Sequence, residues 1–316
     1  MTQQAPDPQA IHPEMQLLMS ARKPAPAGQT LEQARAAWAA YSAALSQPHP
    51  ANMQVHDRTI ASGDIDVPVR IYRPEGPDGL RPCIIYMHGG GFMKGDLDSS
   101  DTNAWGYAQE TGACVVSVDY RLAPEHPHPA AFDDCFGVLC WLAAEGGAMG
   151  IDTARIAVAG DSAGGSLAAA LSLAARDRKG PSIVAQLLIF PCTGTDLRSP
   201  SYVEHANAPG LTTSGMEQYY KDYLAGCEDM DDPYARPDRA TDFSNLPPAF
   251  VHPAEFDPLR DDGRVYASKI ALAGGDVGFR EAKGMIHGFI RARLAGPAAA
   301  AEFQAGCDFL RRYLFA

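Results

Sequence analysis

The sequence has no excess of basic residues. Its 26 Lys and Arg residues are outnumbered by 38 Asp and Glu residues, which gives a formal net charge of −12 and a sequence pI near 5.1. Nucleic acids and anionic membrane surfaces bind proteins through basic patches. The charge balance therefore argues against nucleic acid or an anionic bilayer as a partner.

Long apolar runs are also missing. No stretch of 18 apolar residues occurs, so we expect no membrane-spanning helix. The first ten residues, MTQQAPDPQA, have neither the basic start nor the apolar run of a secretory signal peptide. Hydrophobic residues make up 46% of the chain and charged residues 20%, as in an ordinary globular protein.

Cysteine is present without any pattern. The seven cysteines are odd in number and form no CxxC pair or Cys/His spacing typical of a metal site. Cys83 and Cys114 lie inside apolar runs, which favours buried, unreactive thiols. A chain of 316 residues can bury a large core without disulfides or metal. We expect a reduced, cytoplasmic compartment and no bound metal.

From about residue 55, short runs rich in Val and Ile alternate with helical stretches. Nearly continuous apolar runs are typical of central strands covered on both faces. The expected strands span residues 66–74, 82–89, 113–120, 155–161, 185–191, 247–256 and 276–284. The expected helices span residues 103–111, 130–145, 166–179, 261–273 and 297–313. This alternation predicts an α/β fold with a mostly parallel sheet flanked by helices.

Two segments interrupt the alternation. Residues 1–50 are rich in Ala, Gln and Pro, and a helix expected over 30–46 begins with a capping box formed by Thr30 and Gln33. The other segment, residues 192–240, has the pattern of a loop, a helix and a loop. We therefore expect a core over 51–191 and 241–316, and a helical cap made of N-terminal helices in 1–50 and an insertion at 192–240.

Residues 160–164, Gly-Asp-Ser-Ala-Gly, match the pattern G-x-S-x-G. The motif follows one expected strand directly and opens the next helix, which is the setting of a nucleophile elbow. Glycine at 160 and 164 removes Cβ atoms that would clash in so sharp a turn. The adjoining helix N-terminus favours developing negative charge. Ser162 is the predicted nucleophile; the alternative is a glycine-rich turn with an idle serine.

A second glycine motif, HGGGF at 88–92, follows another expected strand. Acyl transfer develops negative charge on a carbonyl oxygen, which backbone N–H groups can stabilise. We predict that Gly90, Gly91 and Ala163 supply these donors, with Gly89 as a further member of the oxyanion hole. The alternative is a phosphate-binding loop, but the motif lacks the P-loop lysine and the GxGxxG spacing.

A nucleophilic serine needs a base and a group that orients the base. His287 and Asp257 each follow an expected strand, so they should meet Ser162 at the same edge of the sheet. The order Ser, Asp, His along the chain is that of the α/β-hydrolase fold. Asp261 and Asp262 compete with Asp257, but both lie where acidic residues favour the start of the next helix.

Several long motifs together resemble the bacterial hormone-sensitive-lipase-like family of α/β-hydrolase carboxylesterases. They are HGGGF at 88–92, DYRLAPEHPHPAAFDD at 119–134, GDSAGG at 160–165, LPPAFVHPAEFDPLRDDG at 246–263 and HGF at 287–289. The resemblance implies an esterase for short to medium acyl chains, without a cofactor. By position it assigns the triad to Ser162, Asp257 and His287. It also implies a cap, and relatives that often dimerise suggest a homodimer.

The chain departs from the family pattern at His128, where Phe is usual, and at Gln218, where Trp is frequent. These changes bear on the pocket lining and acyl preference. The glycine triplet is of the type associated with bulky alcohols, including tertiary alcohol esters. An amidase, formamidase or lactonase could use the same machinery. A non-catalytic ligand receptor on this fold would be expected to lack a triad member, usually the histidine, which is present here.

Overall fold

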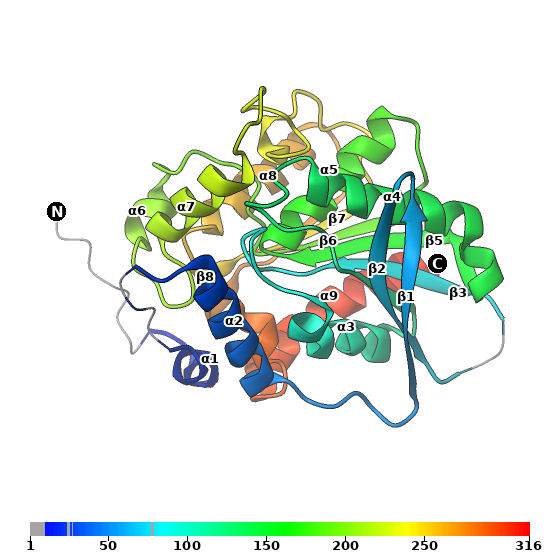
Figure 1. Ribbon diagram of the computed structural model, residues 1–316, viewed down its shortest axis with the longest axis horizontal. Coiled ribbons are helices and arrows are strands. Elements are labelled where there is room, and N and C mark those ends of the chain that lie inside the picture. The colour runs from blue at the N-terminus through cyan, green and yellow to red at the C-terminus, as the bar shows by residue number, and fades with distance from the viewer. Residues whose placement is uncertain (1–9, 24–25, 27, 77–78) are drawn as a thin grey trace.

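The computed structural model describes residues 10–23, 26, 28–76 and 79–316. Helices lie on both sides of a twisted central sheet (Figure 1). The helices are α1 Gln16–Ala21, α2 Leu31–Leu45, α3 Leu97–Thr111, α4 Ala130–Glu145, α5 Ala163–Asp177, α6 Pro200–Glu204, α7 Thr213–Tyr223, α8 Arg260–Leu272 and α9 Pro297–Leu314. Short 3-10 helices span η1 Pro13–Met15, η2 Gly146–Met149, η3 Pro237–Arg239 and η4 Phe289–Ala292.

The strands are β1 Met53–Ser62, β2 Ile65–Pro74, β3 Arg81–Met87, β4 Cys114–Val118, β5 Ile151–Asp161, β6 Ala185–Ile189, β7 Ala249–His252, β8 Ala254–Phe256, β9 Val277–Phe279 and β10 Ala282–Ile286. The main sheet has the order β1-β2-β4-β3-β5-β6-β7-β9. β2 is antiparallel to both β1 and β4, and the pairs from β4 through β9 are parallel. The prediction of a mostly parallel sheet is confirmed.

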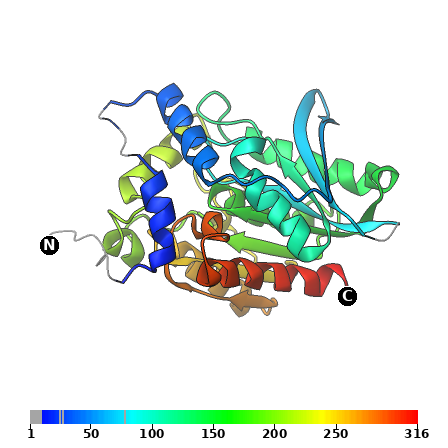
Figure 2. The same cartoon turned by 90° about the horizontal axis from the view of Figure 1, so that it is seen from below.

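Side-chain alternation along the central strands divides the core in two. On β3, Cys83, Ile85 and Met87 pack on the face covered by α4, α5 and α8. Ile84 and Tyr86 point to the other face, which is covered by α3 and α9. Figure 2 shows this second face, and α3 and α9 are in contact on it. Burial on both faces explains why the strand read as a continuous apolar run.

Two predicted strands are wrong in extent, because each is broken into two. Residues 247–256 form β7 and β8, with Pro253 between them. Proline has no N–H for a ladder, so the chain leaves the main sheet there. Residues 276–284 are also divided between two strands, β9 and β10. β8 and β10 make a separate two-stranded parallel sheet. This separation places the ends of β8 and β10 side by side.

Other boundaries differ at places where polar residues hid the pattern. β1 was not predicted, since its middle residues are polar and mostly exposed. The helix expected from 103 begins earlier, at Leu97, with Asp96 as its cap and Ser99 completing a capping box. The predicted capping box of α2 is confirmed: Thr30 and Gln33 exchange both hydrogen bonds.

The segments expected to form a cap lie at one end of the sheet. α1 and α2 from the N-terminal segment lie beyond the carboxyl ends of the parallel strands, near α6 and α7 from the insertion (Figure 1). Arg22, which follows α1, donates a hydrogen bond to the carbonyl of Gly210 in the loop before α7. Two segments far apart in sequence therefore meet above the same edge of the sheet.

All seven cysteines are free thiols, and Cys83 and Cys114 are buried. Burial raises the pKa of both thiols, which keeps them protonated. Within the part of the chain that the structure describes, no helix is long and apolar enough to cross a membrane. Over the same residues, no group of three or more His, Cys, Asp or Glu side chains is arranged to hold a metal ion.

Candidate active site

Ser162 stands at a sharp turn between the end of β5 and the start of α5. Its backbone has φ 56° and ψ −118°, a conformation that non-glycine residues rarely adopt. Such strain costs about 1–3 kcal/mol and persists only where the surroundings enforce it. Here the N–H of Ser162 donates to the carbonyl of Ile189 on β6 at 2.9 Å, and its own carbonyl accepts from Ser166 at 3.1 Å. The sheet and the helix together hold the turn.

The glycines of the turn are required by close backbone approaches. A Cβ atom on Gly160 would lie 2.1 Å from the carbonyl oxygen of Gly164. A Cβ atom on Gly164 would lie 1.9 Å from the carbonyl oxygen of Met87 at the end of β3. The elbow thus packs directly against the strand that leads into the second glycine motif.

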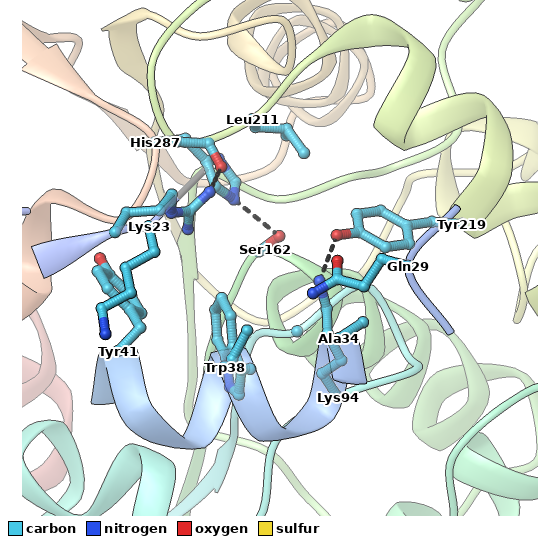
Figure 3. Close-up of a pocket in the computed structure, with 15 residues that line it drawn as sticks. Lys23, Gln29, Ala34, Trp38, Tyr41, Lys94, Ser162, Leu211, Tyr219 and His287 are labelled. Carbon is cyan, nitrogen blue, oxygen red and sulfur yellow. Dashed lines mark hydrogen bonds between the residues drawn. The ribbon is translucent and has the colours of Figure 1, made fainter. Parts of the chain in front are cut away.

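The structure brings Ser162, His287 and Asp257 together. Ser162 Oγ lies 3.0 Å from His287 Nε2, and His287 Nδ1 lies 2.7 Å from Asp257 Oδ2. Figure 3 shows His287 pointing toward Ser162. Because a carboxylate only accepts, Nδ1 carries the proton and Nε2 is left to accept from the serine hydroxyl. The three side chains form one connected line along which a proton can move.

Local structure fixes each partner. Asp257 follows β8 and is fully buried, and its Oδ1 accepts the N–H of Leu259 at 2.9 Å. His287 follows β10, and its ring packs against Phe190 with the centroids 4.7 Å apart. The small sheet of β8 and β10 therefore delivers the carboxylate and the imidazole to the same place.

The two competing carboxylates lie elsewhere. Asp261 Oδ2 accepts the N–H of Ser201 at 2.8 Å. Asp262 Oδ1 accepts the N–H of Gly194 at 3.1 Å, and burial raises the pKa of Asp262 to about 7. Both carboxyl groups hold the insertion to α8.

Gly90 and Gly91 line the same pocket as Ser162. Both have positive φ, 145° and 64°, and a Cβ atom on Gly90 would lie 1.9 Å from the carbonyl oxygen of Lys94. Across the described residues, neither N–H has a hydrogen-bond partner. The N–H of Ala163 belongs to the first turn of α5, where helices leave their donors unpaired. These donors are available to a ligand beside Ser162.

Gly89 does not fit the predicted role. Its N–H donates to Asp161 Oδ1 at 3.2 Å, and the Tyr86 hydroxyl donates to the same oxygen at 2.5 Å. Because this N–H already donates to a buried carboxylate, it is not free to donate to an oxyanion at Ser162. Gly89 therefore anchors the loop to the elbow through Asp161. Sequence reasoning missed Asp161, although it directly precedes the predicted nucleophile.

A cavity of about 140 Å³ opens over Ser162. Its lining comes from α2, the glycine loop, the elbow and the insertion (Figure 3). The side chains that surround it include Arg22, Lys23, Trp38, Tyr41, Lys94, Leu211 and Tyr219. Sequence reasoning identified none of these, because the cap meets the core through contacts that no local pattern encodes.

The departures noted at His128 and Gln218 do not change this lining. His128 is buried, and its Nε2 lies 2.8 Å from Asp232 Oδ2. Gln218 is exposed and donates to Asp222 at 2.6 Å. Neither side chain reaches the cavity over Ser162.

Known proteins share this sequence and fold. A family profile described as "alpha/beta hydrolase fold" matches residues 84–291. Carboxylesterase NlhH of Mycobacterium tuberculosis is 42% identical over 268 residues, 84% of each chain. An ethyl acetate hydrolase of Pseudomonas putida is 39% identical over 230 residues, 71% of this chain and 72% of its own. A solved thermostable esterase from Pseudomonas putida superposes with a TM-score of 0.92 at 30% identity, covering 98% of this chain and 99% of its own.

The residues matched by the family profile include both glycine motifs and the segment that carries Asp257 and His287. The chain belongs to the α/β-hydrolase fold family, in its hormone-sensitive-lipase-like group.

Proposed function

We propose that this protein is a serine carboxylesterase that hydrolyses short- to medium-chain acyl esters. The observation that carries the proposal is the hydrogen-bonded line from Ser162 through His287 to Asp257. Beside it lie the backbone N–H groups of Gly90 and Gly91, which have no partner among the residues that the structure describes. The names of its relatives, a carboxylesterase and an ethyl acetate hydrolase among them, support the same chemistry.

In the proposed cycle, His287 takes the proton of Ser162 as the hydroxyl oxygen attacks the ester carbonyl. The N–H groups of Gly90, Gly91 and Ala163 stabilise the oxyanion, and Asp257 stabilises the imidazolium. His287 then protonates the leaving alcohol. Water, activated by the same imidazole, releases the acid from the acyl-enzyme. The cycle uses only the side chains and backbone N–H groups of this site together with water, and no step needs a cofactor.

We propose that residues 1–50 and 192–240 act as the cap and that 51–191 and 241–316 carry the chemistry. The cavity of about 140 Å³ between these parts is small, which supports short to medium acyl groups. An amidase, formamidase or lactonase would use the same residues. A ligand receptor is disfavoured, because a receptor has no need for an imidazole hydrogen-bonded to a strained serine.

Cytoplasmic location and a homodimer remain predictions. The seven free thiols support a reducing compartment. Size-exclusion chromatography with light scattering would measure the oligomeric state directly.

The proposed function is tested by comparing the wild-type protein with Ser162→Ala. The wild type should hydrolyse 4-nitrophenyl butyrate, and the variant should lose several orders of magnitude in kcat while keeping its unfolding temperature. A series from acetate to laurate would define the acyl preference, with amides and lactones in the same panel. Turnover by Ser162→Ala, or a wild type that a fluorophosphonate probe does not label, would refute the assignment.

A further inference from the structure

The cavity over Ser162 is positively charged in a protein that is strongly acidic. Three cationic side chains, Arg22, Lys23 and Lys94, line it, and no Asp or Glu does among the described residues. The chain as a whole carries a formal net charge of −12. In the part of the chain that the structure describes, none of the three cations lies within 4.0 Å of a carboxylate. A neutral ester substrate would not require three cationic side chains around the cavity.

The three cations differ in how they are held. Arg22 donates to the carbonyl of Gly210 and lies over the ring of Tyr41 at 5.0 Å, so it ties α1 to the loop beside His287. Lys23 is exposed at the rim. Lys94 is half-buried, and its Nζ donates to the Tyr219 hydroxyl at 2.6 Å. An ammonium group has three donors, so Lys94 keeps two for a ligand.

Lys94 is also fixed to the glycine loop. Its backbone N–H donates to the carbonyl of Gly90 at 3.1 Å, and its ammonium lies 5.4 Å from the ring centre of Trp38 and 4.9 Å from that of Tyr219. The Tyr219 ring in turn lies against Gly91, where an added Cβ atom would be 2.7 Å from it. The charge therefore has a set position relative to the predicted oxyanion donors.

In a bound ester, that position would be on the acyl side of the reacting carbon. His287 must reach both the serine oxygen and the leaving alcohol, so the alcohol lies on the His287 side. The acyl chain then extends away from His287. Figure 3 shows Tyr219 and Lys94 on the opposite side of Ser162 from His287. A negative group at the far end of the acyl chain would meet Lys94.

We propose that the substrates of this esterase are anionic esters, namely hemiesters of dicarboxylic acids, whose free carboxylate is bound by Lys94. The proposal rests on the proposed esterase function and adds its substrate class. The ester bond is cleaved as described above, and the products are an alcohol and a dicarboxylate. The second carboxylate takes no part in bond making and serves to bind and orient the acyl chain.

The test compares monoethyl succinate, glutarate and adipate with ethyl butanoate, pentanoate and hexanoate, which have the same acyl lengths without the charge. Release of acid is followed by titration at constant pH and low ionic strength. For at least one length, the wild type should show kcat/KM at least about ten-fold higher for the hemiester, the value of a charge-assisted hydrogen bond. Lys94→Met should remove that preference, and Lys94→Arg should retain part of it.

Lys221→Met is the matched control. Lys221 lies on α7 like Tyr219, but it is exposed and outside the cavity lining, so this variant removes the same charge and should keep the hemiester preference. Equal efficiency on both ester series in the wild type would overturn the proposal, as would a preference that Lys94→Met leaves intact. If the Lys94 variants do not fold, a wild-type preference that is insensitive to salt would overturn it. Cleavage of neither series would instead refute the esterase function itself.

Discussion

Replacement of Asp257 by Asn separates geometry from charge at this site. The two side chains have nearly the same shape, and Asp257 is fully buried with both oxygens paired. Oδ1 accepts the N–H of Leu259 at 2.9 Å, so an amide at 257 must keep its oxygen on that side. Its NH₂ group is then directed at His287 Nδ1, which lies 2.7 Å from Oδ2 in the wild type.

This orientation reverses the tautomer of the His287 imidazole. Because the amide nitrogen donates, Nδ1 of His287 must accept, and the ring proton moves to Nε2. Nε2 faces Ser162 Oγ at 3.0 Å, and a protonated Nε2 cannot take the serine proton. The wrong tautomer together with the lost carboxylate charge should lower kcat by about four orders of magnitude, with little change in KM.

The assay is steady-state hydrolysis of 4-nitrophenyl butyrate, with the rate of fluorophosphonate labelling as a second readout. Glu255→Gln is the control: Glu255 accepts the N–H of Gly284 at 2.7 Å, and a glutamine oxygen can do the same without touching His287. The control should stay within a few-fold of the wild type. An Asp257→Asn protein that retained a tenth of wild-type kcat would show that Asp257 does not orient the base.

Three further outcomes are expected. Gly91→Ala places a Cβ atom 2.7 Å from the Tyr219 ring at a residue with φ 64°, and should lower kcat for 4-nitrophenyl butyrate by about 100-fold; a normal rate would exclude the glycine loop from catalysis. Asp262 binds its proton more tightly when folded, with a pKa of about 7 against an ordinary 3.8, so its contribution to stability is fully present below about pH 4 and lost as pH rises to 7. Urea unfolding should therefore show the wild type losing stability relative to Asp262→Asn between about pH 4 and pH 7, and a constant difference would contradict this. Purified enzyme that cleaves ethyl acetate should also cleave tert-butyl acetate, and failure to do so would sink the expectation from the glycine triplet.

The reacting residues could be predicted because local rules determine them. Ser162 needs glycine at 160 and 164, since any other residue would strike backbone oxygens, and this constraint is visible as a motif. His287 and Asp257 could be found from their places after strands and their order along the chain. Gly89 was misassigned because a motif gives no direction for an N–H. Only the contact with Asp161 reveals where that N–H points.

The cavity lining could not be predicted in the same way. Lys94 and Tyr219 are separated by 125 residues, and their contact depends on how the insertion folds over the glycine loop. β1 was missed for a related reason, because its pairing with β2, and not its own apolarity, makes it a strand. The break after β7 coincides with Pro253, which the sequence shows, but the pairing of β8 with β10 in a second sheet is a tertiary contact that periodicity does not encode.

The placement of α2 has a consequence for how specificity can change. This helix supplies one wall of the cavity through Ala34, Trp38 and Tyr41, while the reacting groups stand on turns that follow β5, β8 and β10. Many residues of α2 are exposed and make no part of the central sheet. Mutations of the cavity-lining residues of α2 can change which substrates the enzyme accepts without replacing any of the reacting groups on those turns. Selection can thus alter part of substrate recognition through a stretch of the gene that encodes none of the reacting groups.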